Sequence, residues 1–343
     1  MSRRVVRLPG DVVSFRVDQR GFLVTALLVL LTLASGLVAL GVGGIFINAI
    51  DVARVFLGQA EPAVRDLIID WRLPRVAIGV LFGAALGISG AVFQSLLRNP
   101  LGSPDVIGFD AGAYSGALVT IIATGATAYV IPGSLVAGVV TAMAVYLLAW
   151  NRGVQGFRLI VVGIAVTAML GSLNTYLILK ADIYTAVLAS IWGAGSLNGL
   201  EAPELRSGAI VIGLLCIPLV FFAPHLKLLE IGDDGARALG LRVELSRPLL
   251  IGLGVALSAT VTALAGPIPF VALCAPQIAA RLTRGPGPHL LSAAAVGAFL
   301  VVLCDVIAAN AFPQILPVGL VTVSVGGLYL IWLVFRQVRR VPA

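Results

Sequence analysis

Long runs of apolar residues alternate along the chain with short breaks that carry arginine, proline, glycine and aspartate. A helix needs about 20 apolar residues to cross the hydrocarbon core of a bilayer. Most of the runs approach this length, so the pattern predicts an all-α, polytopic membrane protein with ten transmembrane helices. The expected spans are 21–47, 75–97, 106–124, 132–150, 158–179, 207–222, 248–264, 270–282, 290–309 and 317–335.

The eighth expected span, residues 270–282, is too short to cross a bilayer alone. It can do so only if residues 266–269 and their flanks also lie at membrane depth. Irregular backbone is tolerated at that depth when protein surrounds it. We therefore expect residues 266–269 to be enclosed by other helices.

Composition supports a membrane protein. The 343 residues are 59% hydrophobic and 11% charged, with a mean hydropathy of +1.05, which excludes a water-soluble globular protein. No polar stretch is long enough for a soluble domain. We expect a cytoplasmic arm at residues 1–20, one transmembrane domain at residues 21–336 and a cytoplasmic tail at residues 337–343.

The distribution of basic residues predicts the orientation. With both termini in the cytoplasm, the cytoplasmic segments hold 17 of the 23 lysines and arginines, as the positive-inside rule requires. The net charge of +7 therefore reflects membrane orientation rather than nucleic-acid binding. Six basic residues remain in the outer segments: Arg54, Arg65, Arg72, Arg75, Lys180 and Arg206.

The common enzyme signatures are absent from the sequence. His225 and His289 lie far apart, so no metal cluster is expected, and neither Lys180 nor Lys227 follows a glycine-rich phosphate loop. We expect no catalytic residue, no metal ligand and no nucleotide site in this chain. Energy for transport would come from a partner protein or from an ion gradient.

Two carboxylates fall inside the expected spans, where ionisable side chains are costly and often functional. Asp110 lies about one turn into the third span, and Asp305 lies toward the outer end of the ninth. One hypothesis makes them proton relays of an ion-coupled secondary transporter. The other, which we favour, is that each carboxyl is hydrogen-bonded to neighbouring helices or to backbone.

Small residues recur at four-residue spacing in the second span, at Gly79, Gly83 and Gly87, and Gly90 follows. This spacing places glycines on one helix face, where they allow the backbone of another helix to approach closely. The pattern predicts a tightly packed bundle and indicates no substrate.

The connection between the sixth and seventh spans, residues 230–247, is longer than simple linkage requires. Asp233 or Asp234 is a natural N-cap, residues 236–239 suit a short helix, and Gly240 suits its left-handed end. We expect a short helix here that projects from the cytoplasmic face.

A second short turn, residues 242–246, is expected to lead to Pro248 at the start of the next span, where proline is tolerated. The two short helices would form a rigid projection. From these residues alone, a docking surface and a simple linker both remain open.

Several motifs, in order along nearly the whole chain, resemble the iron-chelate and vitamin B12 importer permeases, the FecCD type of bacterial ABC importer. Within that family the chain is similar to one of the two permeases of ferric enterobactin importers, at SPDVIGF (103–109), AGSLNGL (194–200) and AGP (265–267). The family motifs are WRLPR (71–75), GAALGISGAVFQ (83–94), RNPLGSPD (98–105), GDD (232–234) followed by Gly240, and LPVG (316–319).

The resemblance implies the type II ABC importer permease architecture and roles for particular residues. The segment from residue 232 to 240 matches the family's coupling helices, which sit in a cleft of the ATPase and transmit its closure. The implied ATPase-coupling residues are Gly232, Asp233, Asp234, Ala236, Leu239 and Gly240. The implied cytoplasmic gate residues are Asn99, Leu101, Gly156 and Phe157.

Arg72 and Arg75 match outer-face arginines that pair with glutamates of a substrate-binding protein. The alternative is that these arginines only anchor a helix end at the interface. B12-type members carry another arginine four residues after the ninth-span aspartate, where this chain has Ala309. A second, different permease could supply the missing contact, so we expect a heterodimer more than a homodimer.

The leading hypothesis is a non-catalytic permease subunit, in the bacterial cytoplasmic membrane, of an ABC importer for ferric siderophores. The implied partners are an ABC ATPase dimer, a second permease and an extracytoplasmic siderophore-binding protein. ATP and Mg²⁺ would bind the ATPase, and this chain would bind no cofactor. The alternatives are heme or vitamin B12 as the cargo, or the secondary transporter.

Overall fold

The structure is a computed structural model that describes residues 3–7, 14–125, 129–150, 156–285 and 287–338. Within these residues the chain is almost entirely helical. In chain order the elements are β1 (Arg3–Arg7), β2 (Ser14–Asp18), α1 (Gln19–Gly41), α2 (Ala49–Phe56), α3 (Pro62–Asp66), the π-helical turn η1 (Leu67–Arg72), α4 (Leu73–Leu97), the 3-10 turn η2 (Pro104–Ile107), α5 (Phe109–Thr124), α6 (Val130–Ala149), α7 (Gly156–Lys180), α8 (Ile183–Gly193), α9 (Ala202–Glu230), α10 (Asp233–Ala238), α11 (Val243–Ala265), α12 (Val271–Thr283), α13 (Leu290–Asn310) and α14 (Val318–Val338).

Each expected span coincides with one helix, namely α1, α4, α5, α6, α7, α9, α11, α12, α13 and α14. Among the described residues, seven helical stretches are long and apolar enough to cross a membrane. They are α1, the continuous stretch Pro62–Leu97 that contains α4, and α6, α7, α9, α11 and α13. Helices α5, α8 and α12 are shorter apolar helices, and the stretch Val318–Leu333 of α14 is also apolar.

The connections are more helical than the sequence indicated. The polar segment after α7 contains α8, an apolar helix whose N-cap Asp182 accepts a hydrogen bond from the backbone N–H of Thr185 at 3.0 Å. With 11 residues, α8 is shorter than the length of about 20 residues that a helix needs to cross a bilayer. Helix α9 also continues through Pro218 and Pro224 to Glu230, beyond the expected end at residue 222.

The N-terminal arm pairs β1 with β2 as an antiparallel ribbon, and α1 begins at Gln19. Parts of the expected arm, residues 1–2 and 8–13, lie outside the described residues, as do residues 339–343 of the expected tail. The arm, domain and tail boundaries stay predictions.

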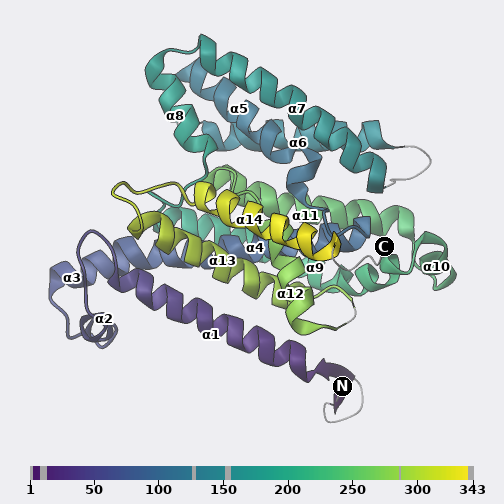
Figure 1. The fold of residues 1–343 in the computed structure, drawn as a ribbon, viewed down its shortest axis with the longest axis horizontal. Helices are drawn as coiled ribbons and strands as arrows, with labels where there is room; N and C mark the ends of the chain where they lie inside the picture. The colour runs from purple at the N-terminus through teal and green to yellow at the C-terminus, as the bar shows by residue number, and fades with distance from the viewer. Residues whose placement is uncertain (1–2, 8–13, 126–128, 151–155, 286, 339–343) are drawn as a thin grey trace.

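The helices form three layers (Figure 1). Helices α5–α8 lie along one side, α4, α9 and α11–α14 form the centre, and α1 lies along the opposite side. Helix α10 lies at one end of the long axis, which we call the α10 end, and α2 with α3 lies at the other, the α2 end. The start of α1 and the end of α14 both lie toward the α10 end.

The centre of the bundle depends on close contact between α4 and α13. A Cβ at Gly83 would overlap the backbone of Gly297, and a Cβ at Gly87 would overlap the carbonyl of Ala293. A Cβ at Gly90 would instead overlap the carbonyl of Ala272, near the start of α12. The predicted close backbone approach is confirmed at Gly83, Gly87 and Gly90, whereas a Cβ at Gly79 would meet only side chains, at 3.4 Å or more.

The shortness of α12 is explained by the backbone that precedes it. Thirteen helical residues span about 20 Å, less than a hydrocarbon core of about 30 Å. Residues 266–268 are non-helical and buried, as expected for irregular backbone at membrane depth. The preceding carbonyl of Ala265 accepts a hydrogen bond from the N–H of Ser196 at 2.7 Å, so the end of α11 is tied to the loop after α8.

Replacing Gly87 with alanine tests the α4–α13 contact. The new methyl group must force the two backbones apart, and we expect the free energy of unfolding to fall by about 1–3 kcal/mol. Thermal unfolding in detergent, followed by size-exclusion chromatography, measures the change. The matched control is Gly213→Ala in α9, because nothing lies within 4 Å of a Cβ there. Equal unfolding midpoints for the two variants would contradict the proposed role of Gly87.

Candidate functional site

The expected projection at residues 230–247 is present, and its short helix is α10. The N-cap is Gly232, with φ 111°, and no side chain caps the helix, so the predicted aspartate cap is wrong. The reason is that Asp233 already lies inside the first turn, where its carboxylate binds Arg247 instead. Gly240 has φ 85°, which confirms the predicted left-handed position.

The predicted second short helix, residues 242–246, is also wrong, because α11 begins at Val243 and continues without a break to Ala265. The N–H of Ser246 already donates to the carbonyl of Arg242, so the helical ladder starts before Pro248. Proline has no N–H, but this costs only one bond near the helix start. The coupling segment, residues 230–247, is therefore one short helix attached directly to a long one.

Two sets of ion pairs surround α10. Arg247 holds Asp233 in a two-bonded contact, with N–O distances of 2.8 and 2.6 Å. Arg237 contacts Asp234 at 3.1 Å and Glu244 at 2.8 Å, and its side chain is 47% exposed. The hydrogen bond to Glu244 raises the pKa of Arg237 above its usual value.

The apolar residues of this segment separate into buried and exposed sets. Ala236 is fully buried against the bundle, whereas Leu239 is 62% exposed and Ile231 is 66% exposed. A charged projection with two large apolar side chains at its surface has the composition of a protein-binding surface.

The end of α4 lies beside the coupling segment. Glu230 accepts a hydrogen bond from the hydroxyl of Ser95 at 3.0 Å, and the guanidinium of Arg98 lies 3.3 Å from the Cβ position of Gly232. Arg98 ends α4 with φ 50°, and Arg284 ends α12 in the same way with φ 51°. The contact between Glu230 and Ser95 could not be predicted, because 135 residues separate them along the chain.

The four expected gate residues lie near the same end of the bundle. Asn99 accepts a hydrogen bond from the N–H of Leu101 at 2.9 Å, which shapes the loop after α4. Leu101 is 51% exposed and Phe157 is 81% exposed, and the Cβ position of Gly156 lies 3.1 Å from the carbonyl of Leu97. The α4 loop and the start of α7 thus come together, while the gate role stays a prediction.

Two glutamines that sequence reasoning missed tie the α4 end to α12. Gln277 is 6% exposed and donates to the carbonyl of Pro100 at 2.6 Å, and Gln94 donates to the carbonyl of Leu273 at 2.9 Å. An amide inside an expected apolar span was the available signal, since a buried amide requires a partner. These bonds fix the position of the loop that carries Asn99 and Leu101.

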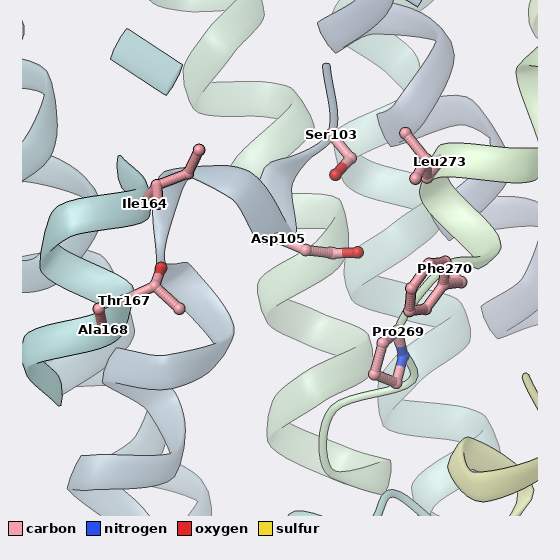
Figure 2. Close-up of a pocket in the computed structure, with 8 residues that line it drawn as sticks. All are labelled: Ser103, Asp105, Ile164, Thr167, Ala168, Pro269, Phe270 and Leu273. Carbon is pink, nitrogen blue, oxygen red and sulfur yellow. The ribbon is translucent and has the colours of Figure 1, made fainter. Parts of the chain in front are cut away.

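A cavity of about 410 Å³ lies between the η2 turn, α7 and the start of α12 (Figure 2). Asp105 projects from η2 toward the wall that carries Phe270 and Leu273, and α7 forms the opposite wall. The lining is otherwise mainly apolar, and its residues are Ser103, Asp105, Ile164, Thr167, Ala168, Pro269, Phe270 and Leu273.

The two carboxylates at membrane depth both have partners on neighbouring helices. Asp110 on α5 accepts a hydrogen bond from Thr262 of α11 at 2.9 Å. Asp305 on α13 binds Arg75 of α4 through two hydrogen bonds, at 2.9 and 2.8 Å. Sequence reasoning placed Asp305 and Arg75 separately and missed this pair, whose members are 230 residues apart.

Both expected docking arginines also make intramolecular contacts at the α2 end. Arg72 donates to the carbonyls of Leu40 and Ile45, at 2.7 and 2.6 Å. The side chain of Arg75 is 24% exposed and that of Asp305 is 10% exposed. Both arginines therefore anchor helix ends, and the docking role stays a prediction.

The FecCD transport family matches residues 28–336, which is most of the chain and includes the coupling segment and both arginines. The chain belongs to this family. The ferric enterobactin transport system permease protein FepG of Escherichia coli is 45% identical over 326 residues, covering 94% of this chain and 99% of FepG. The achromobactin transport system permease protein CbrC of Dickeya dadantii is 35% identical, covering 91% of each chain.

A solved metal-chelate type ABC transporter in an inward-facing conformation has the same fold. The two chains superpose with a TM-score of 0.81 and 25% identity, covering 91% of this chain and 99% of the other. The predicted type II ABC importer permease fold is thus confirmed. This FecCD chain is a multi-pass membrane permease, as its apolar helices and its permease relatives indicate.

The anchoring role of Arg75 in this FecCD chain can be tested by stability. Arg75→Gln leaves the Asp305 carboxylate without its counter-ion, so we expect the free energy of unfolding to fall by about 3 kcal/mol. The Arg75→Gln, Asp305→Asn double variant should regain most of the loss, because two amides can bond to one another. Thermal unfolding of the purified proteins measures both.

The control is Arg54→Gln, which removes an exposed ion pair with Asp51 and should cost less than about 1 kcal/mol. If Arg75→Gln is as stable as Arg54→Gln, the pair with Asp305 does not anchor α4 to α13.

Proposed function

We propose that this chain is the permease subunit of an ABC importer that carries a ferric siderophore across the bacterial cytoplasmic membrane. The observation that carries the proposal is the 45% identity to the ferric enterobactin permease, which extends over 94% of the chain. The coupling segment supports the proposal, because a permease without a nucleotide site needs a surface to which an ATPase can bind.

We favour this proposal over the secondary-transporter hypothesis. That hypothesis required ionisable groups at membrane depth that are available to carry a proton. Asp110 is hydrogen-bonded to Thr262, and Asp305 is neutralised by Arg75. Each carboxyl therefore has a structural role that joins two helices.

In this proposal the coupling segment binds an ABC ATPase dimer, and ATP with Mg²⁺ binds that dimer rather than this chain. Leu239 and Ile231 supply the exposed apolar contact, and Asp234 with Arg237 supplies charge. The segment and both termini lie on the cytoplasmic side, in agreement with the excess of arginine there.

The α2 end then faces outward and receives the extracytoplasmic siderophore-binding protein. Arg72 and Arg75 present partly exposed guanidinium groups whose positions are fixed by the bonds to Leu40, Ile45 and Asp305. Charge complementarity at such a site mainly steers and orients the incoming protein. Asn99, Leu101, Gly156 and Phe157 would form the cytoplasmic gate at the opposite end.

The permease works as one half of a dimer, and we propose an unlike partner. Ala309 leaves this chain without the third outer arginine of B12-type permeases, and a different chain could supply it. Helix α7 offers a surface for such a partner, because large apolar side chains along it are exposed, among them Ile164, Met169 and Leu173.

Uptake of labelled ferric enterobactin, heme and vitamin B12 in a deletion strain tests the cargo and the energy source. We expect only the ferric siderophore to enter, and we expect uptake to stop when the ATPase is inactivated by mutation. Uptake that persists without the ATPase but collapses with an uncoupler would overturn the proposal. Entry of heme or B12 alone would overturn the assignment of the cargo.

Native mass spectrometry tests the composition of the dimer. The chain is expressed with the ATPase and the binding protein, with and without the second permease of its system. We expect a stable complex only when the second permease is present, with one copy of each permease. A transport-competent complex with two copies of this chain would refute the heterodimer.

A further inference from the structure

The ion pairs around α10 differ in exposure, and the coupling role by itself does not explain the difference. The pair formed by Asp233 and Arg247 is the more enclosed one, with side-chain exposures of 30% and 10%. It also has two charge-assisted hydrogen bonds in parallel, the arrangement that fixes orientation as well as distance. The pairs of Arg237 are more exposed, so water and salt weaken them.

Helix α10 has few other means of keeping its orientation. It has six residues, follows a glycine with φ 111° and is followed by Gly240 with φ 85°. Glycine permits many backbone conformations. The C-terminal flank is held to the helix itself by bonds from the N–H groups of Gly240 and Leu241 to the carbonyls of Arg237 and Ala236, and these bonds do not reach α11. Ala236 is buried, but a methyl group gives no directional contact. Two ion pairs join α10 to α11, Asp233–Arg247 and Arg237–Glu244. The less exposed of them, the two-bonded contact from Arg247, is therefore the stronger restraint on the direction of α10 relative to α11.

Helix α11 extends from this ion pair into the centre of the bundle. It packs against α4, α9, α6 and α5. Near its far end Thr262 is bonded to Asp110 of α5, and its last residue, Ala265, precedes the buried non-helical backbone before α12. A displacement of the start of α11 therefore reaches the layer of α5–α8 and the cavity beside Asp105.

We propose that Arg247 is a positioning residue for energy coupling, which locks α10 to α11 so that movement of the ATPase is passed to the membrane helices. This inference rests on the proposed function, in which the coupling segment binds the ATPase. Without the ion pair between Asp233 and Arg247, α10 would still bind the ATPase through Leu239 and Ile231. Its rotation would then be absorbed at Gly232 and Gly240 and would not reach α11.

The test uses the complete importer in proteoliposomes, with ferric enterobactin and its binding protein as the probe. Two quantities are measured: retention of the ATPase on purification, and ferric enterobactin transported per ATP hydrolysed. We expect Arg247→Glu and Asp233→Arg to retain the ATPase while the transport ratio falls about tenfold, because each places like charges together. The charge-exchanged double variant should restore the ratio to within about threefold of the original.

Arg247→Lys provides a milder test if charge reversal prevents insertion. Lysine keeps the charge but cannot form the two-bonded contact, so we expect a transport ratio between those of the original and Arg247→Glu. Gly213→Ala in α9, where nothing lies within 4 Å of a Cβ, is the control variant and should leave the ratio unchanged. If Arg247→Lys equals the original, or if the double variant is no better than the single ones, the inference is wrong.

Leu239→Asp separates this inference from the proposed function. It places a charge on the exposed apolar surface of the coupling segment without touching the ion pair, and we expect the ATPase to be lost on purification. If Leu239→Asp retains the ATPase, the proposed coupling surface is wrong. If Leu239→Asp loses the ATPase while every Arg247 variant transports normally, only the role of Arg247 is overturned.

Discussion

The backbone contact between α4 and α13 is the constraint on which the rest of the molecule depends. Gly83 and Gly87 meet Gly297 and Ala293 without intervening side chains, so the two helices cannot slide or separate without losing continuous packing. At one end of α4, Arg75 is bonded to Asp305 of α13. At the other end, α4 reaches the coupling segment. One rigid pair of helices thus fixes both ends of the bundle.

Features that depend on sequence-local physics could be predicted. Apolar length identified ten segments that each coincide with a helix, seven of which lie in stretches long and apolar enough to cross a membrane. Four-residue glycine spacing identified the close helix face, and the shortness of residues 270–282 identified buried irregular backbone before α12. The short helix of the coupling segment and the left-handed Gly240 could also be predicted, because glycine and helix-capping chemistry act within a few residues.

Features that depend on distant partners could not be predicted. The prediction of an aspartate cap at α10 is wrong because Arg247, 14 residues away in the sequence, binds the Asp233 carboxylate. Gln277 donates a hydrogen bond to the carbonyl of Pro100, 177 residues away in the sequence. Nothing in the sequence near either residue predicts this contact. Polar residues in apolar surroundings signal that a partner exists, but they do not identify it. The docking, gate and coupling roles are those that the family resemblance implies.

The short α12 also constrains how the protein enters the membrane. Its 13 residues and the preceding Gly266, Pro267 and Pro269 offer too little apolar length for partition as an independent helix. Its non-helical backbone is tolerated only inside protein. During synthesis, α12 therefore has to enter the lipid together with α11 as a helical hairpin, or wait beside the insertion machinery until α13 is made. The length of one helix thus constrains the order in which the helices enter the membrane.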